Sequence, residues 1–490
     1  MLKTPPLASV LLALAASLLS VPPVQASSVV IHVTSPADSG PGTLRQAILD
    51  GNALPSTDAP DVRVDLLPSQ PIKLESSLPT ITSTSFTISG TLSRYAVIDG
   101  QSNHRILTAD AEVLLLQIDN LMLTNGYNPS GHGACVWYQG TGWLAIEDSW
   151  FKDCTAYIGE EYLAMGAAVD SSAAITAVSN SHFIGNVAIG GAGAFGAAIA
   201  ASYEGASLSV HDSEFRENTV MSTATGVYAA AGGAIAGRET TVEASRFIDN
   251  AAYAGNGAPS RGGAIYNWPD ALEVRSSVFL DNQSQQGGAI YVSLATGSFA
   301  MIGNNTFVAN RATLHDGGAL YAADWAMLEL RNNSFWLNSA TTAGDNIAGI
   351  GSLGAFNNLF ARGLGAGDSC SGLTSVAGSD YNIVPASECG IGATGGNVIT
   401  QELHLRGFRL DGSEPLQFFA DSPALGGANP GPVDDSLGTA CLEQDANGNP
   451  RPADGDADSV ARCDIGAFES QHEAPLFAAD FEERLNPATP

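Results

Sequence analysis

Residues 262–290 decide the fold of this chain, because they contain two motifs that recur along it. The first motif is Gly262-Gly263-Ala264-Ile265, repeated as Gly287-Gly288-Ala289-Ile290, and the second is Phe279-Leu280-Asp281-Asn282. The first motif, Gly-Gly-Ala-Ile, has copies that begin at Gly232 and Gly317 and weaker copies at His132, Gly166 and Gly196. The second motif, Phe-x-x-Asn, places its aromatic residue at Phe151, Phe183, Phe215, Phe247, Phe279, Phe307 and Phe335, with Cys154 replacing Asn in the first copy. These positions are separated by 32, 32, 32, 32, 28 and 28 residues.

A period of this length, with β-rich motifs and almost no helical periodicity, predicts a β-solenoid. Each strand of such a coil pairs with its equivalent one turn away, at about 4.8 Å, so identical residues stack. We expect the phenylalanines to form an internal stack and the asparagines to hydrogen-bond at a tight turn. A β-propeller needs blades of about 40 residues, which these intervals do not supply.

Composition and charge limit the partners. Asp and Glu number 50 against 20 Lys and Arg in 490 residues, a net charge of −30. Nucleic acid and anionic membranes are excluded, because binding them requires basic surfaces. We expect residues 1–26 to be a signal peptide, because residues 7–19 are apolar and Val24-Gln25-Ala26 provides small residues for cleavage. No later stretch is apolar enough to span a membrane, so we expect a secreted or outer-surface protein.

Six cysteines in an exported chain indicate disulfides. We pair Cys370 with Cys389 and Cys441 with Cys463, because each pair is close in sequence within a Gly/Asp-rich region. The remaining pair, Cys135 and Cys154, is either a third disulfide or two buried thiols.

The two motifs resemble the repeats of the polymorphic outer membrane protein family. This resemblance implies a right-handed parallel β-helix, here of roughly ten coils. Residues 33–48 resemble the start of many secreted bacterial β-helix proteins, as does Leu78-Pro79-x-Ile81 followed by Ile98-Asp99-Gly100. We expect residues 43–52 to form a short amphipathic helix that caps the first coil, within an N-terminal cap at 27–60.

The C-terminal part resembles the module called choice-of-anchor Q. The matching residues are Asp380-Tyr381-Asn382, Asp421-Ser422-Pro423-Ala424, Arg451-Pro452 and Cys463-Asp464-Ile465-Gly466-Ala467-Phe468-Glu469. We therefore divide the rest of the chain into repeats at 61–368, this loop-rich module at 369–470 and a flexible tail at 471–490. The tail is similar to short terminal motifs of other exported proteobacterial proteins, which implies a Gram-negative bacterium.

Motifs for catalysis are weak. Gly131-His132-Gly133 resembles a motif of pectin-hydrolysing β-helix enzymes, but no Asp-Asp pair precedes it and its register fits a degenerate repeat, so we interpret it as structural. Asp445-x-Asn447-x-Asn449 resembles a calcium loop, but Pro450 replaces the required Gly, so a turn-rich surface loop is the better interpretation. We identify no catalytic residue.

Two rows of residues are candidate binding sites. Tyr266, Tyr291 and Tyr321 follow the inward apolar position of the first motif, so strand alternation turns them outward, with Trp268 nearby. Such a row offers flat apolar area to sugar rings or to a protein, or it merely stabilises adjacent coils.

The residue before the motif asparagine is acidic in three consecutive coils: Glu217, Asp249 and Asp281. Stacked carboxylates are candidate calcium ligands, or they occupy a solvated turn where Asp is favoured.

We conclude from the sequence that the chain is an adhesin-like interaction protein that binds a polysaccharide or a surface protein. Calcium is the one cofactor that the residues suggest. The alternative function is a polysaccharide lyase or glycoside hydrolase of the β-helix type.

Overall fold

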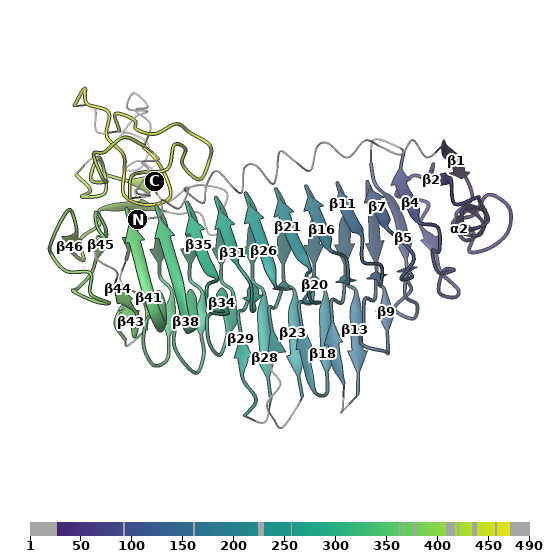
Figure 1. The fold of residues 1–490 in the computed structure, drawn as a ribbon, viewed down its shortest axis with the longest axis horizontal. Helices are drawn as coiled ribbons and strands as arrows, with labels where there is room; N and C mark the ends of the chain where they lie inside the picture. The colour runs from purple at the N-terminus through teal and green to yellow at the C-terminus, as the bar shows by residue number, and fades with distance from the viewer. Residues whose placement is uncertain are drawn as a thin grey trace, which may run out of the picture.

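The computed structural model describes residues 27–91, 94–159, 162–223, 230–255, 257–361, 363–365, 367–375, 379–407, 417–419, 421–433, 439–455 and 458–470. These residues form a right-handed parallel β-helix of about ten turns with a single helix (Figure 1). The predicted fold class is confirmed. The expected signal peptide and the tail at 471–490 lie outside the described residues, and the division into domains stays a prediction.

Two parallel ladders form the largest sheet and merge where β38 and β41 run through both. The first ladder contains β1 (Ser27–Val33), β2 (Asp58–Val64), β4 (Ser85–Gly90), β7 (Leu115–Asp119), β11 (Trp143–Glu147), β16 (Ile175–Ser179), β21 (Ser207–His211), β26 (Glu239–Glu243), β31 (Leu272–Arg275), β35 (Phe299–Gly303), β38 (Leu320–Arg331), β41 (Ile347–Phe356) and β44 (Thr374–Ser375). The second ladder contains β6 (Leu107–Ala109), β10 (Val136–Tyr138), β15 (Val169–Ser171), β20 (Ile199–Ala201), β25 (Ile235–Gly237), β30 (Ile265–Asn267) and β34 (Ile290–Ser293), and it continues through β38 and β41 to β43 (Cys370–Ser371). The strands that begin after the Gly-Gly-Ala motif belong to this second ladder.

The third ladder is a sheet of 13 strands that carries the motif phenylalanines. It contains β3 (Ile72–Lys73), β5 (Ala96–Asp99), β8 (Leu121–Thr124), β12 (Trp150–Lys152), β17 (His182–Ile184), β22 (Glu214–Arg216), β27 (Arg246–Ile248), β32 (Val278–Leu280), β36 (Thr306–Val308), β39 (Ser334–Trp336), β42 (Leu359–Phe360), β45 (Ile383–Val384) and β46 (Val398–Ile399). From Phe151 to Phe360 the ring centroids of neighbouring coils lie 4.8 to 5.0 Å apart and nearly parallel. These rings fill the core of the helix.

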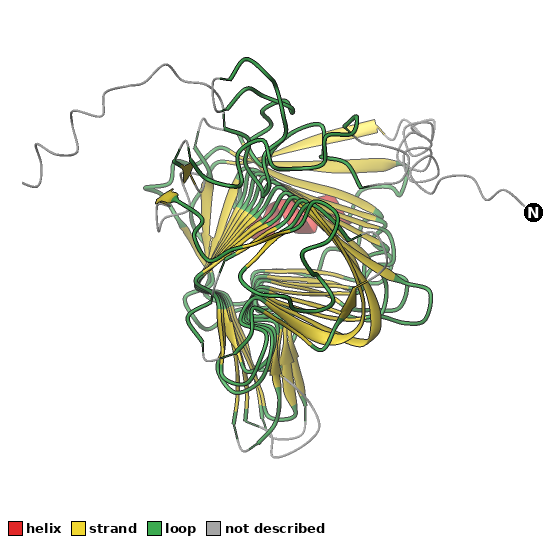
Figure 2. Cartoon of the chain, turned by 90° about the vertical axis from the view of Figure 1, so that its left-hand side faces the viewer, coloured by secondary structure: helices red, strands yellow, loops and turns green. Residues whose placement is uncertain are grey.

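Two further sheets follow the motif asparagines. One contains β9 (Tyr127–Asn128), β13 (Thr155–Ile158), β18 (Val187–Gly190), β23 (Thr219–Ser222), β28 (Ala251–Ala254), β33 (Gln283–Ser284), β37 (Arg311–Ala312) and β40 (Ser339–Ala340), and the other contains β14 (Leu163–Met165), β19 (Gly193–Phe195), β24 (Ala230–Ala231) and β29 (Ser260–Arg261). Figure 2, viewed along the long axis, shows strands that project from the coil. We call β13, β18, β23 and β28, together with β14, β19, β24 and β29, the lobe. Small residues such as Ala156, Ala188 and Ala194 form its separate core, so its two sheets approach closely.

The asparagine ladder satisfies every polar atom of its side chains. Asn250 donates from Nδ2 to the Phe215 carbonyl and to Oδ1 of Asn282, both at 2.9 Å. Its own Oδ1 accepts from the backbone N and from Nδ2 of Asn218. Because each asparagine repeats this pattern, a buried amide at every coil carries no unpaired donor or acceptor.

A second polar ladder precedes the phenylalanines, and the sequence analysis missed it. Hydroxyls of Ser181, Ser213, Ser245 and Ser277 accept from the backbone N of the preceding serine at 3.1 Å. Asparagine takes the position from the next coil onward, as Asn305, Asn333, Asn358 and Asn382.

The two ends of the coil are covered differently. The helix α2 (Leu44–Asn52) begins at its N-cap Thr43 and buries Leu44, Ala47 and Ile48 against the first coil, as predicted. At the other end, β47 (Leu405–Gly407) and β48 (Gln417–Phe418) pair antiparallel, and the loops beyond them pack Ala424, Ile465 and Phe468 on the last coils.

Candidate functional site

The acidic row lies on a tight turn. Glu217, Asp249 and Asp281 are exposed and have φ angles of 57°, 54° and 53°, the left-handed region. Gly185 takes the same place in an earlier coil with φ 65°. Gly and Asp are both favoured in this conformation, so the backbone accounts for Asp249 and Asp281. Ala309 and Leu337 take the same place in later coils with φ angles of 54° and 56°, so an acid is not required there.

The Asp249 and Asp281 carboxylates of this row are destabilised in their charged form. Although the Asp249 side chain is exposed, partial desolvation of its carboxylate, followed by the charges of Asp281 and Glu217, raises the pKa of Asp249. Burial also raises the pKa of Asp281, while Arg311 opposes the shift. Among the described residues, no group of three or more His, Cys, Asp or Glu side chains is placed to hold a metal ion.

The tyrosine row stacks as strand register requires. The Tyr266 and Tyr291 rings lie 5.7 Å apart and the Tyr291 and Tyr321 rings 5.4 Å apart. However, Tyr291 is only 6% exposed, so the exposure expected for it is wrong. Its ring lies between two neighbouring rings and under the Arg261 guanidinium, 5.1 Å from the ring centroid. Trp268 is 49% exposed, with the Arg238 guanidinium 5.8 Å from its ring.

An exposed apolar row on the lobe was missed by the sequence analysis. Tyr157, Ile189, Met221 and Tyr253 pair in register across β13, β18, β23 and β28. Tyr157 and Tyr253 are each 45% exposed and Met221 is 38% exposed. We call these four residues the lobe row. Its signal was present in the sequence, because each member lies three positions after the ladder residue Cys154, Asn186, Asn218 or Asn250.

Disulfides join Cys135 with Cys154, Cys370 with Cys389 and Cys441 with Cys463. These are the expected pairings. Cys135 and Cys154 form a disulfide and are not two buried thiols. Cys154 begins the asparagine ladder, since its backbone N donates to Oδ1 of Asn186. The disulfide therefore ties the first member of this ladder to the second ladder of strands.

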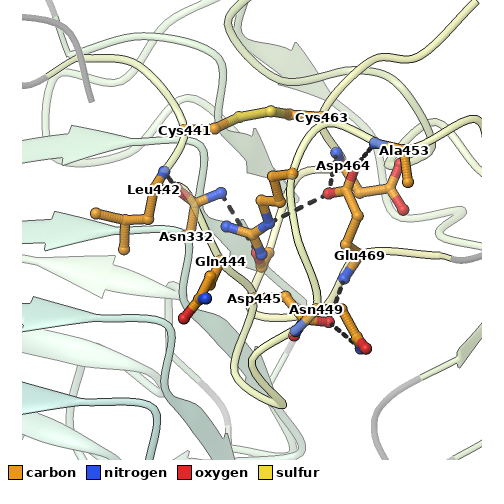
Figure 3. Close-up of polar contacts among 12 residues, drawn as sticks. Asn332, Cys441, Leu442, Gln444, Asp445, Asn449, Ala453, Cys463, Asp464 and Glu469 are labelled. Atoms are coloured by element: carbon orange, nitrogen blue, oxygen red, sulfur yellow. Dashed lines mark hydrogen bonds and ion pairs between the residues drawn. A yellow bond between two sulfur atoms is a disulfide. The ribbon is translucent and has the colours of Figure 1, made fainter. Parts of the chain in front are cut away.

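Asp445 organises its own turn. Its Oδ1 accepts from the backbone N of Asn447 and of Asn449, and its Oδ2 accepts from Asn449 Nδ2 and the Glu469 backbone N. These donors occupy the oxygens that a cation would need, which agrees with the interpretation as a turn. Figure 3 shows Asp464 near the Cys441–Cys463 disulfide and Asp445 farther from it, beside Asn449.

A buried arginine in an ion pair also links these C-terminal loops to the coil. Arg451 Nε lies 3.2 Å from Glu469 Oε2, and neither side chain is exposed. Arg451 also donates to Asn304 Oδ1 in the β-helix, at 3.1 Å. Burial raises the pKa of Glu469 to about 7, and the nearby Asp464 carboxylate adds to the shift.

The fold defines the class: a right-handed parallel β-helix, one coil segment of which is similar to a polymorphic membrane protein repeat. The model of the Chlamydia polymorphic membrane protein repeat matches residues 276–293, which contain Phe279, Asn282 and the Gly287 motif. No curated protein and no solved structure matched the chain. Among the described residues, no helix has the length and apolar character to cross a bilayer.

Proposed function

We propose that this chain is an exported, adhesin-like protein that acts outside the cell or on its outer surface and binds glycans of a host or neighbouring cell. The polymorphic membrane protein repeat supports a surface location. The choice-of-anchor Q resemblance of residues 369–470 and the signal peptide at 1–26 are part of this proposal.

The observation that carries the proposal is the lobe row. Three of its four members are large apolar side chains that are more than one third exposed, on a lobe that projects from the coil. A contiguous apolar row on a projecting surface marks a contact site rather than scattered surface residues. Tyrosines supply rigid, amphipathic contact area at low cost in conformational entropy.

Glycan is the favoured partner for two reasons. Successive members of the row are one strand spacing apart, about 4.8 Å, which is close to the length of a hexose ring. The net charge of −30 disfavours polyanions. The glycan is therefore expected to be neutral or weakly charged.

A pair of matched variants tests the proposal on a glycan array and on whole cells. Tyr253→Ala is expected to weaken binding at least tenfold, as for an exposed aromatic residue that contributes strongly to a contact. Trp143→Ala removes an aromatic side chain of similar exposure from β11 on another face and is expected to leave binding unchanged. Equal binding by both variants would contradict the role of the lobe row.

The same samples test the enzymatic alternative. Incubation with a polysaccharide panel, followed as reducing ends and unsaturated products, is expected to show no turnover. Reproducible depolymerisation would replace the adhesin-like function with a lyase or hydrolase function.

A further inference from the structure

His132 is held in place from several sides. It forms a bridge with Met165 of β14, and its ring lies 5.7 Å from the Trp137 ring in a stacked arrangement. Arg105 lies 4.5 Å from the Trp137 ring centroid and donates to the carbonyls of His132 and Gly133. The imidazole therefore has a fixed position and orientation.

A buried carboxylate sets the chemistry of this imidazole. His132 Nδ1 lies 2.7 Å from Asp170 Oδ2, and the Asp170 side chain is 0% exposed whereas that of His132 is 33% exposed. The other oxygen, Asp170 Oδ1, is buried without a hydrogen-bond partner. We assign the Nδ1 proton to this hydrogen bond because the carboxylate is an acceptor. Nε2 is then left as an acceptor.

Such a pair is not explained by stability alone. Burial raises the pKa of Asp170 even though His132 and Arg105 oppose the shift. Burying a carboxylate while one of its oxygens has no hydrogen-bond partner costs folding free energy. A fixed imidazole with a free acceptor is, in contrast, a useful recognition group.

His132 faces a pocket of about 600 Å³, a volume typical of small-ligand sites. The other lining residues are Ser130, Ile158, Tyr162, Leu163, Met165 and Ala192. Within the described residues, His132 Nε2 has no hydrogen-bond partner. The described part of the lining is mostly apolar, and its polar side-chain groups are the imidazole and the hydroxyls of Ser130 and Tyr162.

We propose that this pocket is a subsite for one neutral sugar residue, in which His132 Nε2 accepts a hydrogen bond from a ring hydroxyl. Ile158, Leu163 and Met165 then contact the apolar face of the ring, and Asp170 is a positioning residue that fixes the imidazole tautomer. An anionic sugar is disfavoured because Asp170 lies directly behind the imidazole. The inference rests on the proposed function and deepens it, since the lining residues Ile158 and Leu163 belong to β13 and β14 and so place the pocket at the same end of the lobe as Tyr157.

NMR of the full mature chain with labelled histidine tests the subsite. Lactose, maltose and cellobiose serve as neutral probes, and galacturonic acid serves as the charged comparison. We expect at least one neutral disaccharide to shift the His132 ring resonances in a saturable way at millimolar concentration. His132→Asn can keep a donor to Asp170 but lacks Nε2, so it should bind that sugar at least tenfold more weakly.

Asp170→Asn tests whether the His132 tautomer and sugar binding are linked. If the His132–Asp170 pair were only structural, a change of tautomer would not change the affinity. We expect the ring nitrogen shifts to move toward the Nε2–H tautomer and the affinity to fall together. Unmoved His132 resonances with all three neutral probes, or a response to galacturonic acid alone, would overturn the subsite.

The two proposals fail in different ways. Loss of array binding in Tyr253→Ala with unmoved His132 resonances keeps the proposed function and overturns the subsite. A saturable His132 shift with unchanged array binding in Tyr253→Ala supports the subsite and contradicts the lobe row.

Discussion

Asn218 directs two donors at one oxygen of Asn250: its Nδ2 at 2.9 Å and its backbone N at 3.1 Å. Both residues are fully buried. The coil-to-coil register of the β-helix is thus fixed at a turn by side-chain amides as well as by the strand ladders. A one-residue slip would leave all of these groups unpaired.

Asn250→Ala is expected to destabilise the protein by at least about 2 kcal/mol, because each buried group left without a partner costs about 1–3 kcal/mol. The substitution removes the acceptor of both Asn218 donors and the side-chain donor to the Phe215 carbonyl. Thermal unfolding followed by circular dichroism measures the loss. A midpoint equal to that of the wild type would show that water can replace the ladder.

Asp249→Asn is expected to raise the unfolding midpoint slightly at pH 7, by the equivalent of a few tenths of a kcal/mol for an exposed site. The raised pKa of Asp249 means that the folded state holds its proton more tightly than the unfolded state. Stability is then lost as pH rises through the folded pKa, and the gain in the variant should vanish below the unfolded pKa, about 3.9.

The same melts test calcium. Because the left-handed turn accounts for Asp249 and Asp281, and the described residues form no group of metal ligands, the wild-type midpoint is expected to be the same in millimolar calcium and in chelator. A rise with calcium that disappears in Asp249→Asn would instead assign an ion to Glu217, Asp249 and Asp281 by linkage.

Glu469→Gln is expected to flatten the pH dependence of stability between about pH 4.5 and 7. The pKa of Glu469 is raised to about 7, so its contribution is fully present below the unfolded pKa and is lost as pH rises through about 7. The largest effect for a wholly buried group with this shift is on the order of 3 kcal/mol. Melting wild type and variant at pH 5 and pH 8 provides the comparison. Equal pH slopes in both proteins would show that another group carries the dependence.

Trp268→Ala and Tyr291→Ala are expected to behave differently. Trp268 is half exposed, so its removal should leave the midpoint unchanged and weaken binding only if this face contacts the glycan. Tyr291 is buried between two rings, and truncation of a buried aromatic typically costs about 3–5 kcal/mol. A Tyr291→Ala protein that melts like the wild type would contradict a stabilising role for this buried ring.

Features that repeat with the coil were predictable from the sequence. Phe247 stacks on the equivalent phenylalanines, and Asn250 hydrogen-bonds to the equivalent asparagines. Residues one period apart lie on neighbouring coils, so a repeat in the sequence predicts a contact in the structure. The serine ladder was equally periodic and escaped notice because serine is common at surfaces. The burial of Tyr291 could not be deduced, since it depends on Arg261 in an excursion outside the repeat motifs. His132 and Asp170 are 38 residues apart, a spacing that corresponds to no repeat.

The number of residues between the motif asparagine and the next Gly-Gly-Ala motif varies between coils, while the spacing of the stacked phenylalanine rings does not. The chain takes 12 positions from Asn250 to Gly262 but only 5 from Asn282 to Gly287. Nevertheless, the Phe279 and Phe307 rings remain 4.8 Å apart, as they do between longer coils. Insertions and deletions at this point are therefore absorbed locally, and neither aromatic nor amide stacking has to readjust. Proteins with this architecture can diversify what they recognise by exchanging excursions of different size, while the same inherited scaffold keeps folding.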